Sequence, residues 1–283
     1  MARLPSSVWW YRARRALARS AGDRFALGSA LVLAPHPDDE TIACGLVIAT
    51  KVAHDLNVTV AVASDGRLGW FSADPAPDGT EIAAIRSVEW SNALRALGVS
   101  SESQRQFSLP DQGLAHAEAD LEQRVGALID EVLPDQVFVT APDDLHPDHR
   151  ALARATCRAL ASRAAAAASA DASGTGAARQ PELYAYRVYP AAGIWRQDEL
   201  GDEVAPRPTA QAVARALPRL LTHREFVLRA PDLVAAKHAA VAAHASQRGL
   251  LDGELRFVWD RDIELFTRLD PGLVAPSQRR PPG

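Results

Sequence analysis

The segment SALVLAPHPDDE, residues 29–40, joins a short apolar run to a cluster of histidine and carboxylate side chains. Its apolar half has the length and composition of a strand that is buried on both faces. A second segment, QVFVTAPDDLHPDH at residues 136–149, repeats the arrangement further along the chain. Each segment therefore predicts a buried strand that ends in groups capable of chemistry.

Strand-like and helix-like segments alternate along most of the chain. Strands are expected at 29–34, 57–64, 104–109, 136–141, 182–189 and 225–228, and helices at 41–54, 80–97, 114–133, 148–168, 209–221 and 231–246. This alternation predicts an α/β fold whose mostly parallel sheet is covered by helices on both faces. Since ligands of such sheets bind beyond the carboxyl ends of the strands, the two His/Asp clusters are expected to converge at one edge.

The composition excludes several classes of protein. With 283 residues, 47% apolar and 23% charged, the chain is neither disordered throughout, nor collagen, nor a coiled-coil rod. A net charge of −4 argues against nucleic-acid binding through bulk charge. The first strand is not followed by the G-x-G-x-x-G motif of a dinucleotide site, and no apolar run is long enough to span a membrane. Two cysteines favour a reducing compartment, so we expect a cytoplasmic protein.

Three parts of the chain are expected. Residues 1–24 hold six Arg against Asp23, a net charge of +5, and lack the apolar core of a signal peptide. They predict a basic helix that either packs on the domain or lies on anionic lipid as a peripheral membrane contact. Residues 25–270 are expected to form one α/β domain with a flexible Ala/Ser/Gly-rich insertion near 162–180, and residues 271–283 a proline-rich tail.

The two clusters contain the ligands that zinc prefers, imidazole nitrogen and carboxylate oxygen. His36 and Asp39 lie three residues apart at an expected helix start, and His149 comes from the other cluster. Three protein ligands leave a fourth position for water, which is typical of catalytic zinc. The helix dipole also stabilises carboxylates at a helix start when no metal is bound. Two His/Asp clusters, each directly after a buried strand, nevertheless favour a metal site.

The remaining polar residues of the clusters suggest catalytic roles. Asp38 is a candidate general base for the water. His146, as an imidazolium, is expected to stabilise an oxyanion or to protonate a leaving amine. Asp148 is expected to orient either His146 or His149.

The segments APHPDDE (34–40) and HPDH (146–149) closely resemble the two motifs of the LmbE-like/PIG-L deacetylase family. Weaker similarities are SDG (64–66), RSVEWSNALRALG (86–98), LPDQG (109–113) and KHAAVAAHASQ (237–247), so the resemblance extends over most of the chain. The chain departs from the family in the additional Pro35 and in Asp144, where some members place a tyrosine. These departures affect the expected substrate rather than the expected reaction.

The resemblance implies a Rossmann-like three-layer α/β sandwich that removes the acetyl group from an N-acetylated amino sugar of a small molecule or glycoconjugate. It implies zinc, or ferrous iron in the cell, held by His36, Asp39 and His149. Asp38 would then be the base, and His146 would stabilise the oxyanion with support from Asp148. Arg86 and Asp111 would contact sugar hydroxyls or head-group oxygens. The oligomeric state is left open.

Other interpretations remain open at this stage. The chain could be a metal-dependent hydrolase of another amide or ester, or a non-catalytic glycan-binding relative. His244 either reaches the site or is a packed or surface residue of its helix. Trp70 and Phe71, in the loop 66–79, either form a lid that stacks on a sugar or anchor the loop.

Overall fold

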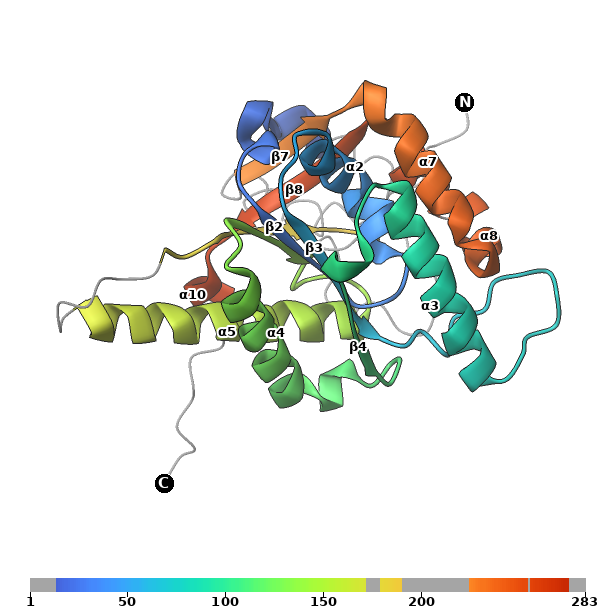
Figure 1. The fold of residues 1–283 in the computed structure, drawn as a ribbon, viewed down its shortest axis with the longest axis horizontal. Helices are drawn as coiled ribbons and strands as arrows, with labels where there is room; N and C mark the ends of the chain where they lie inside the picture. Colours follow the sequence, from blue (N-terminus) through green and yellow to red (C-terminus); the bar gives the residue numbers. More distant parts are fainter. Residues whose placement is uncertain (1–13, 172–178, 190–223, 254, 275–283) are drawn as a thin grey trace, which may run out of the picture.

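The computed structural model describes residues 14–171, 179–189, 224–253 and 255–274. Within these residues the strands form one eight-stranded sheet in the order β1-β7-β8-β6-β5-β2-β3-β4 (Figure 1). The strands are β1 (Arg19–Ser20), β2 (Ala30–Ala34), β3 (Val58–Ser64), β4 (Gln104–Leu109), β5 (Gln136–Thr140), β6 (Glu182–Tyr186), β7 (Arg224–Arg229) and β8 (Ile263–Leu269).

Helices cover both faces of the sheet, which gives the expected three-layer, Rossmann-like α/β arrangement. The α-helices described are α2 (Asp39–Ala53), α3 (Gly79–Ala96), α4 (Glu118–Val132), α5 (Pro147–Asp171), α7 (Val234–Ala243), α8 (Arg248–Asp252), α9 (Arg256–Trp259) and α10 (Pro271–Val274). Single 3-10 turns are η1 (Gly22–Ala26), η2 (Ser101–Ser103), η3 (Leu114–His116), η5 (Pro231–Leu233) and η6 (Ala245–Gln247).

The core consists of two apolar layers that share the central strands. Val32 of β2 faces the layer beneath α2, α3 and α7, whereas its neighbours Leu31 and Leu33 face the layer beneath α4 and α5. Every residue of β2 and β5 is buried. This burial on both faces explains why the two strands are continuous apolar runs rather than alternating ones.

The central strands position the two His/Asp clusters. β2 pairs in parallel with β3 on one side and with β5 on the other. The chain therefore leaves β2 and β5 at the same edge of the sheet, next to the point where the strand order reverses. The predicted convergence of residues 36–40 and 142–149 at one edge is confirmed.

The central strands of the sheet are parallel, but one strand nearer the edge, β8, is antiparallel to its neighbours. β8 pairs antiparallel with both β6 and β7, and the sequence pattern had not predicted this strand. Its buried face includes Glu264, which accepts hydrogen bonds from the backbone N–H groups of Leu46 and Val47 inside α2 and pairs with Lys237 at 2.7 Å. β8 thus attaches α2 and α7 to the sheet through a buried carboxylate.

Within the part of residues 1–24 that the structure describes, the expected helix is present only at residues 14–17. Residues 19–20 form β1, which pairs in parallel with β7, and η1 follows at residues 22–26. The Arg14 guanidinium is buried and pairs with Glu225 of β7 at 2.6 Å. The segment from Arg14 onward is therefore part of the sheet edge, while residues 1–13 lie outside the described part.

Two further expectations need correction. The first ten residues of the supposed flexible insertion, 162–171, continue α5 to Asp171, because a run of alanines has the highest helix propensity. Residues 271–274, expected as the start of a tail, form α10. The rest of the insertion at 172–178, the tail at 275–283 and the helix expected at 209–221 lie outside the described residues.

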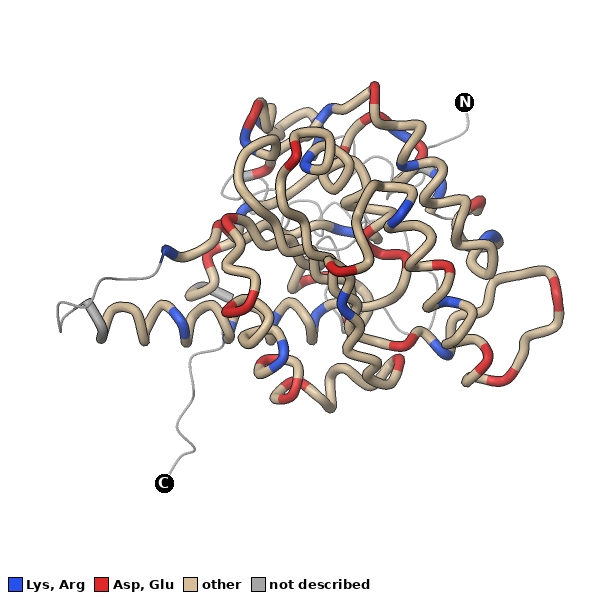
Figure 2. Tube along the Cα trace, in the orientation of Figure 1, with Lys and Arg blue, Asp and Glu red and all other residues tan. Residues whose placement is uncertain are grey.

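No helix among the described residues is long and apolar enough to cross a membrane. In the view of Figure 2, basic and acidic residues are interspersed along the described chain.

Candidate metal and catalytic site

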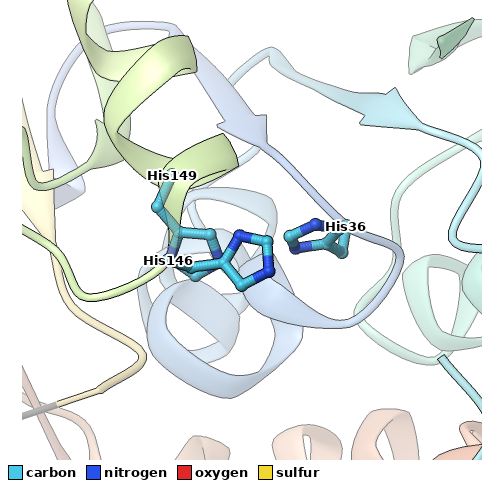
Figure 3. Close-up of side chains that lie close together, drawn as sticks. All are labelled: His36, His146 and His149. Atoms are coloured by element: carbon cyan, nitrogen blue, oxygen red, sulfur yellow. The ribbon is translucent and has the colours of Figure 1, made fainter. Parts of the chain in front are cut away.

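The candidate site lies where β2 and β5 end. His36 and Asp38 belong to the turn between β2 and α2, and Asp39 is the first residue of α2. His146 precedes α5 and His149 lies in its first turn. The three imidazoles face one another across the sheet edge (Figure 3), with ring centroids 4.6–5.3 Å apart.

The three predicted metal ligands meet at one carboxylate oxygen. Asp39 Oδ2 lies 3.1 Å from His36 Nδ1 and 3.3 Å from His149 Nε2. The same oxygen accepts a hydrogen bond from the backbone N–H of His36, at 3.0 Å. Two imidazoles and one carboxylate therefore converge from the two clusters, although they are separated by more than a hundred residues of sequence.

Other carboxylates extend the cluster. His36 Nε2 lies 3.3 Å from Asp111 Oδ1 and 3.4 Å from Asp148 Oδ2, and His149 Nδ1 lies 3.2 Å from Asp144 Oδ1. Among the residues that the structure describes, two sets of three have ligand atoms within 4.8 Å of one another, namely His36 with His146 and His149, and His36 with Asp111 and Asp148.

These donors fit a divalent ion. So many buried carboxylates are costly unless cations balance them, and imidazole with carboxylate is the donor set of borderline metals. The carboxylates behind His36 and His149 are the partners that orient metal-binding imidazoles.

The pKa values of the candidate ligands are shifted by burial and by one another's charges. Burial opposes the charge on Asp39, but His149 and His36 outweigh burial and hold the pKa of Asp39 well below its usual range. Burial likewise lowers the pKa of His149, while Asp39 and Asp144 raise it to a net value of about 9. Because a metal-bound imidazole is neutral, metal binding here would release protons.

Asp38 lies beside the ligands and is held by Arg86. The Arg86 Nη2 atom donates to Asp38 Oδ2 at 3.1 Å and to the Pro37 carbonyl at 3.2 Å, and Nη1 donates to the Gly66 carbonyl at 2.9 Å. Burial raises the pKa of Asp38 to about 7, against the opposing effect of the Arg86 charge. A carboxyl group with such a pKa is suited to proton transfer near neutral pH.

His146 differs from the other two histidines. Its Nδ1 atom accepts a hydrogen bond from the backbone N–H of Asp148 at 3.2 Å, so the ring proton of the neutral form lies on Nε2. Burial and the neighbouring His36 and His149 lower the pKa of His146 to about 4. Both features favour the neutral ring, and the expected role of His146 as an imidazolium stays a prediction.

The structure places Asp148 differently from either expected role. Its side chain contacts His36 and accepts from the backbone N–H of Leu114 at 3.1 Å, whereas Asp144 is the carboxylate beside His149. In the sequence, Asp144 stands out only as a departure from the family pattern. A buried Asp five residues before a candidate ligand is the signal that could have identified it.

The segment that follows α7, residues 244–247, packs next to the site. His244 is fully buried and contacts the Thr41 hydroxyl at 3.3 Å, so it packs behind α2. Ser246 donates through its backbone N–H and its hydroxyl to Glu89. Gln247 lines the cavity and donates to the Gly69 carbonyl at 2.9 Å.

A cavity of about 120 Å³ opens over the cluster. Its polar lining includes the candidate ligands His36 and Asp39 together with Asp38, Asp111 and His146. All of these but Asp111 come from the two motifs. The cavity therefore gives a small polar group access to the ligands and to the candidate base.

Comparisons with known sequences cover the region that contains both motifs. Residues 31–160, which contain both motifs, match the PIG-L family, "GlcNAc-PI de-N-acetylase". Proteins of Bacillus cereus and Bacillus subtilis, each named "Probable N-acetyl-alpha-D-glucosaminyl L-malate deacetylase 2", are 32% identical over 133 residues. The aligned region is 46% of this chain and spans 60% and 59% of the lengths of these two relatives.

Comparisons with solved structures agree with the fold. The N,N'-diacetylchitobiose deacetylase of Pyrococcus horikoshii superimposes with a TM-score of 0.63 at 20% identity, covering 98% of both chains. A teicoplanin deacetylase in a zinc-inhibited form gives 0.58 at 16% identity, covering 86% of this chain and 99% of the other. The 4-carboxy-2-hydroxymuconate hydratase GalB gives 0.55 at 20% identity, covering 80% and 82%. Since the third protein is a hydratase, this fold alone does not determine the reaction.

Proposed function

We propose that the protein, whose residues 31–160 match the PIG-L family, is a divalent-metal-dependent N-deacetylase of a GlcNAc-type conjugate. It would hydrolyse the acetamide to acetate and a free amine. The observation that carries the proposal is the position of Asp39 Oδ2 between His36 Nδ1 and His149 Nε2, next to the buried Asp38. The names of the relatives and neighbours support the choice of an acetylated amino sugar.

His36, Asp39 and His149 would hold the metal, zinc or ferrous iron. A bound divalent ion lowers the pKa of a water molecule and polarises a carbonyl group. Asp144 and Asp148 support the proposal as carboxylates that fix the rings of His149 and His36.

Two residues beside the candidate ligands have separate roles in the proposed reaction, Asp38 in proton transfer and His146 in binding the oxyanion. Asp38 accepts the proton of the attacking water, and its carboxylate is held in place by Arg86. His146 donates a hydrogen bond from Nε2 to the developing oxyanion as a neutral imidazole. Asp38, once protonated, returns its proton to the leaving amine.

The roles of the two expected substrate contacts differ. Asp111 lines the cavity and is proposed to accept a hydrogen bond from a sugar hydroxyl. Arg86 also lines the cavity, but both of its Nη atoms already donate, to Gly66, Pro37 and Asp38, and its Nε is buried. We therefore assign Arg86 to the positioning of Asp38 rather than to direct contact with substrate.

The proposal also covers the cellular compartment, the bounds of the domain and a peripheral membrane contact. We place the deacetylase in the cytoplasm, in keeping with the buried and unpaired Cys44 and Cys157. The domain is proposed to begin no later than Arg14, because Arg14 and β1 join the sheet edge, and to include α10 up to Val274. A peripheral membrane contact, if made, would use the aromatic residues within 1–13.

The test is product analysis with purified, zinc-loaded protein on methyl N-acetylglucosaminide and a panel of other GlcNAc conjugates. We expect acetate and primary amine in equal amounts, and no product from His149→Ala. His54→Ala is the matched control, because His54 is exposed at the opposite end of α2.

Other outcomes would identify the rivals. Amide or ester cleavage without acetate would indicate a different hydrolase, and addition of water to a double bond would indicate a hydratase. Binding of the conjugates without turnover by metal-loaded protein would indicate a glycan-binding relative.

A further inference from the structure

The cavity over the candidate site has an apolar part that the deacetylation itself does not require. Six apolar residues line it, namely Ile42, Leu68, Phe71, Val188, Leu250 and Leu255. They come mainly from the loop after β3 and from the segment around α8, whereas the polar lining comes mostly from the two motifs. An acetyl group needs only a small contact area, so this apolar lining is available to another part of the substrate.

Two of these residues are exposed although their loop is firmly held. Leu68 is 57% exposed and Phe71 45% exposed. The backbone of Phe71 donates to the Ser246 carbonyl and accepts from the Gly249 N–H, both at 2.9 Å. The neighbouring Leu68 N–H donates to Asp111 at 3.2 Å. Loop 66–71 is therefore a preformed rim, and its apolar side chains reach solvent at the cavity instead of the core.

The cations around the cavity are already paired within the described part of the chain. The Arg86 guanidinium is engaged by Asp38 and two backbone carbonyls. Arg67 pairs with Asp65 at 2.7 Å, and Arg248 pairs with Asp252 at 3.2 Å. The carboxylates of Asp38, Asp39 and Asp111 line the cavity as well. Apart from the proposed metal ion, the described residues therefore offer no unpaired cation to an anionic substituent at the cavity rim.

We propose that the site takes an N-acetylated amino sugar whose aglycone, the group attached to the sugar, is neutral and apolar. Leu68, Phe71 and Leu250 bind that aglycone at the cavity rim. This inference rests on the proposed function, because it places the acetamide over His36, Asp39 and His149. It differs from a malate conjugate, for which the Bacillus relatives are named and whose aglycone carries carboxylates.

The expected preference follows from the area that the rim can cover. About 60 Å² of additional buried apolar surface corresponds to about a tenfold gain in affinity. Octyl N-acetylglucosaminide should therefore exceed the methyl glycoside in kcat/KM by about tenfold or more. GlcNAc-malate should fall below the methyl glycoside.

The test measures amine release and, separately, the Kd of the three conjugates by calorimetry. Phe71→Ser and Leu68→Ser should each lower the ratio of kcat/KM for the octyl glycoside to kcat/KM for the methyl glycoside by about tenfold. Val88→Ser is the matched control, because Val88 is an exposed apolar residue on α3 and does not line the cavity.

The outcomes separate this inference from the proposed function. A kcat/KM or affinity for GlcNAc-malate equal to or above that for the octyl glycoside would overturn the apolar preference. Equal losses on the methyl and octyl glycosides in Phe71→Ser would overturn the role of the rim. Release of no amine from any conjugate would instead contradict the deacetylase, and the Kd values of the same three compounds would still decide whether the rim selects an apolar group.

Discussion

Asp38 is the residue on which the proposed chemistry depends most. It is buried, it adjoins the candidate ligand Asp39, and one of its oxygens is held by Arg86. Asp38→Asn keeps the shape of the side chain and removes the proton acceptor. We expect kcat to fall by about 10²–10⁴ while the bound metal remains, measured by acetate release and elemental analysis. An unchanged kcat would exclude Asp38 as the base.

Asp144 is expected to matter through His149. Its Oδ1 atom lies 3.2 Å from His149 Nδ1, and both side chains are almost fully buried. Asp144→Asn should weaken zinc binding by about 10- to 100-fold, because the amide no longer supports the basicity of the ring. Competition with a zinc-binding dye measures this change. Asp120→Asn, an exposed position on α4, should bind zinc like the unaltered protein.

At this scale the sequence predicted which residues meet but not how each is held. His36, Asp39 and His149 could be grouped because strand ends place whole segments together. The partner of each ring could not be predicted, because Asp111, Asp144 and Asp148 are equally suitable by type. Only the packed structure determines that Asp144 lies beside His149 and Asp148 beside His36.

At the scale of elements, the N-terminal segment is held by a buried ion pair. Arg14 pairs with Glu225, whose other oxygen accepts from Thr267 at 2.7 Å. Arg14→Met leaves the Glu225 charge buried without its partner, which should cost about 3–5 kcal/mol in the free energy of unfolding. Urea denaturation measures this loss.

The double variant Arg14→Met/Glu225→Gln distinguishes this cause from lost packing. It should recover much of the stability, since no uncompensated charge remains. Arg15→Met, at an exposed neighbouring position, should change the free energy of unfolding by less than about 0.5 kcal/mol. A loss as large for Arg15 as for Arg14 would contradict this explanation.

The end of α3 depends on a glycine. Gly98 has a φ of +85°, and a Cβ atom there would lie 2.7 Å from Val52 Cγ1 of α2. Gly98→Ala should therefore destabilise the protein by at least about 1–3 kcal/mol. In Gly126→Ala, inside α4, the new Cβ meets only Ala159 Cβ at 3.9 Å, so this variant should gain about 0.5–1 kcal/mol. Thermal unfolding of the two variants measures whether the first loses stability and the second gains it.

The elements that were predicted are those whose pattern is local. β2 and β5 are continuous apolar runs, and Gly98 marks the end of α3 as expected. β8 escaped prediction because Glu264 and Thr267 are buried in it, and their partners Lys237 and Glu225 lie far away in the sequence. Residues 162–171 differ from the expected flexible insertion because their low complexity comes from alanine, which favours helix.

At the scale of the whole molecule, topology is what creates the site. Neither motif binds a metal alone in this proposal, because His36 and Asp39 come from one side of the β2–β5 pair and His149 from the other. The order of the central strands therefore links folding to metal affinity. The same fold supports a hydratase among its neighbours, so the reaction has to be established by chemistry.

The most direct test of the central claim is acetate release from methyl N-acetylglucosaminide as metal-free protein is titrated with zinc. We predict that activity is absent without metal, rises in proportion to bound zinc and reaches its maximum at about one ion per chain. His149→Ala should show neither the tight binding nor the activity. Full acetate release from metal-free protein, or one tightly bound zinc without any acetate, would contradict the account.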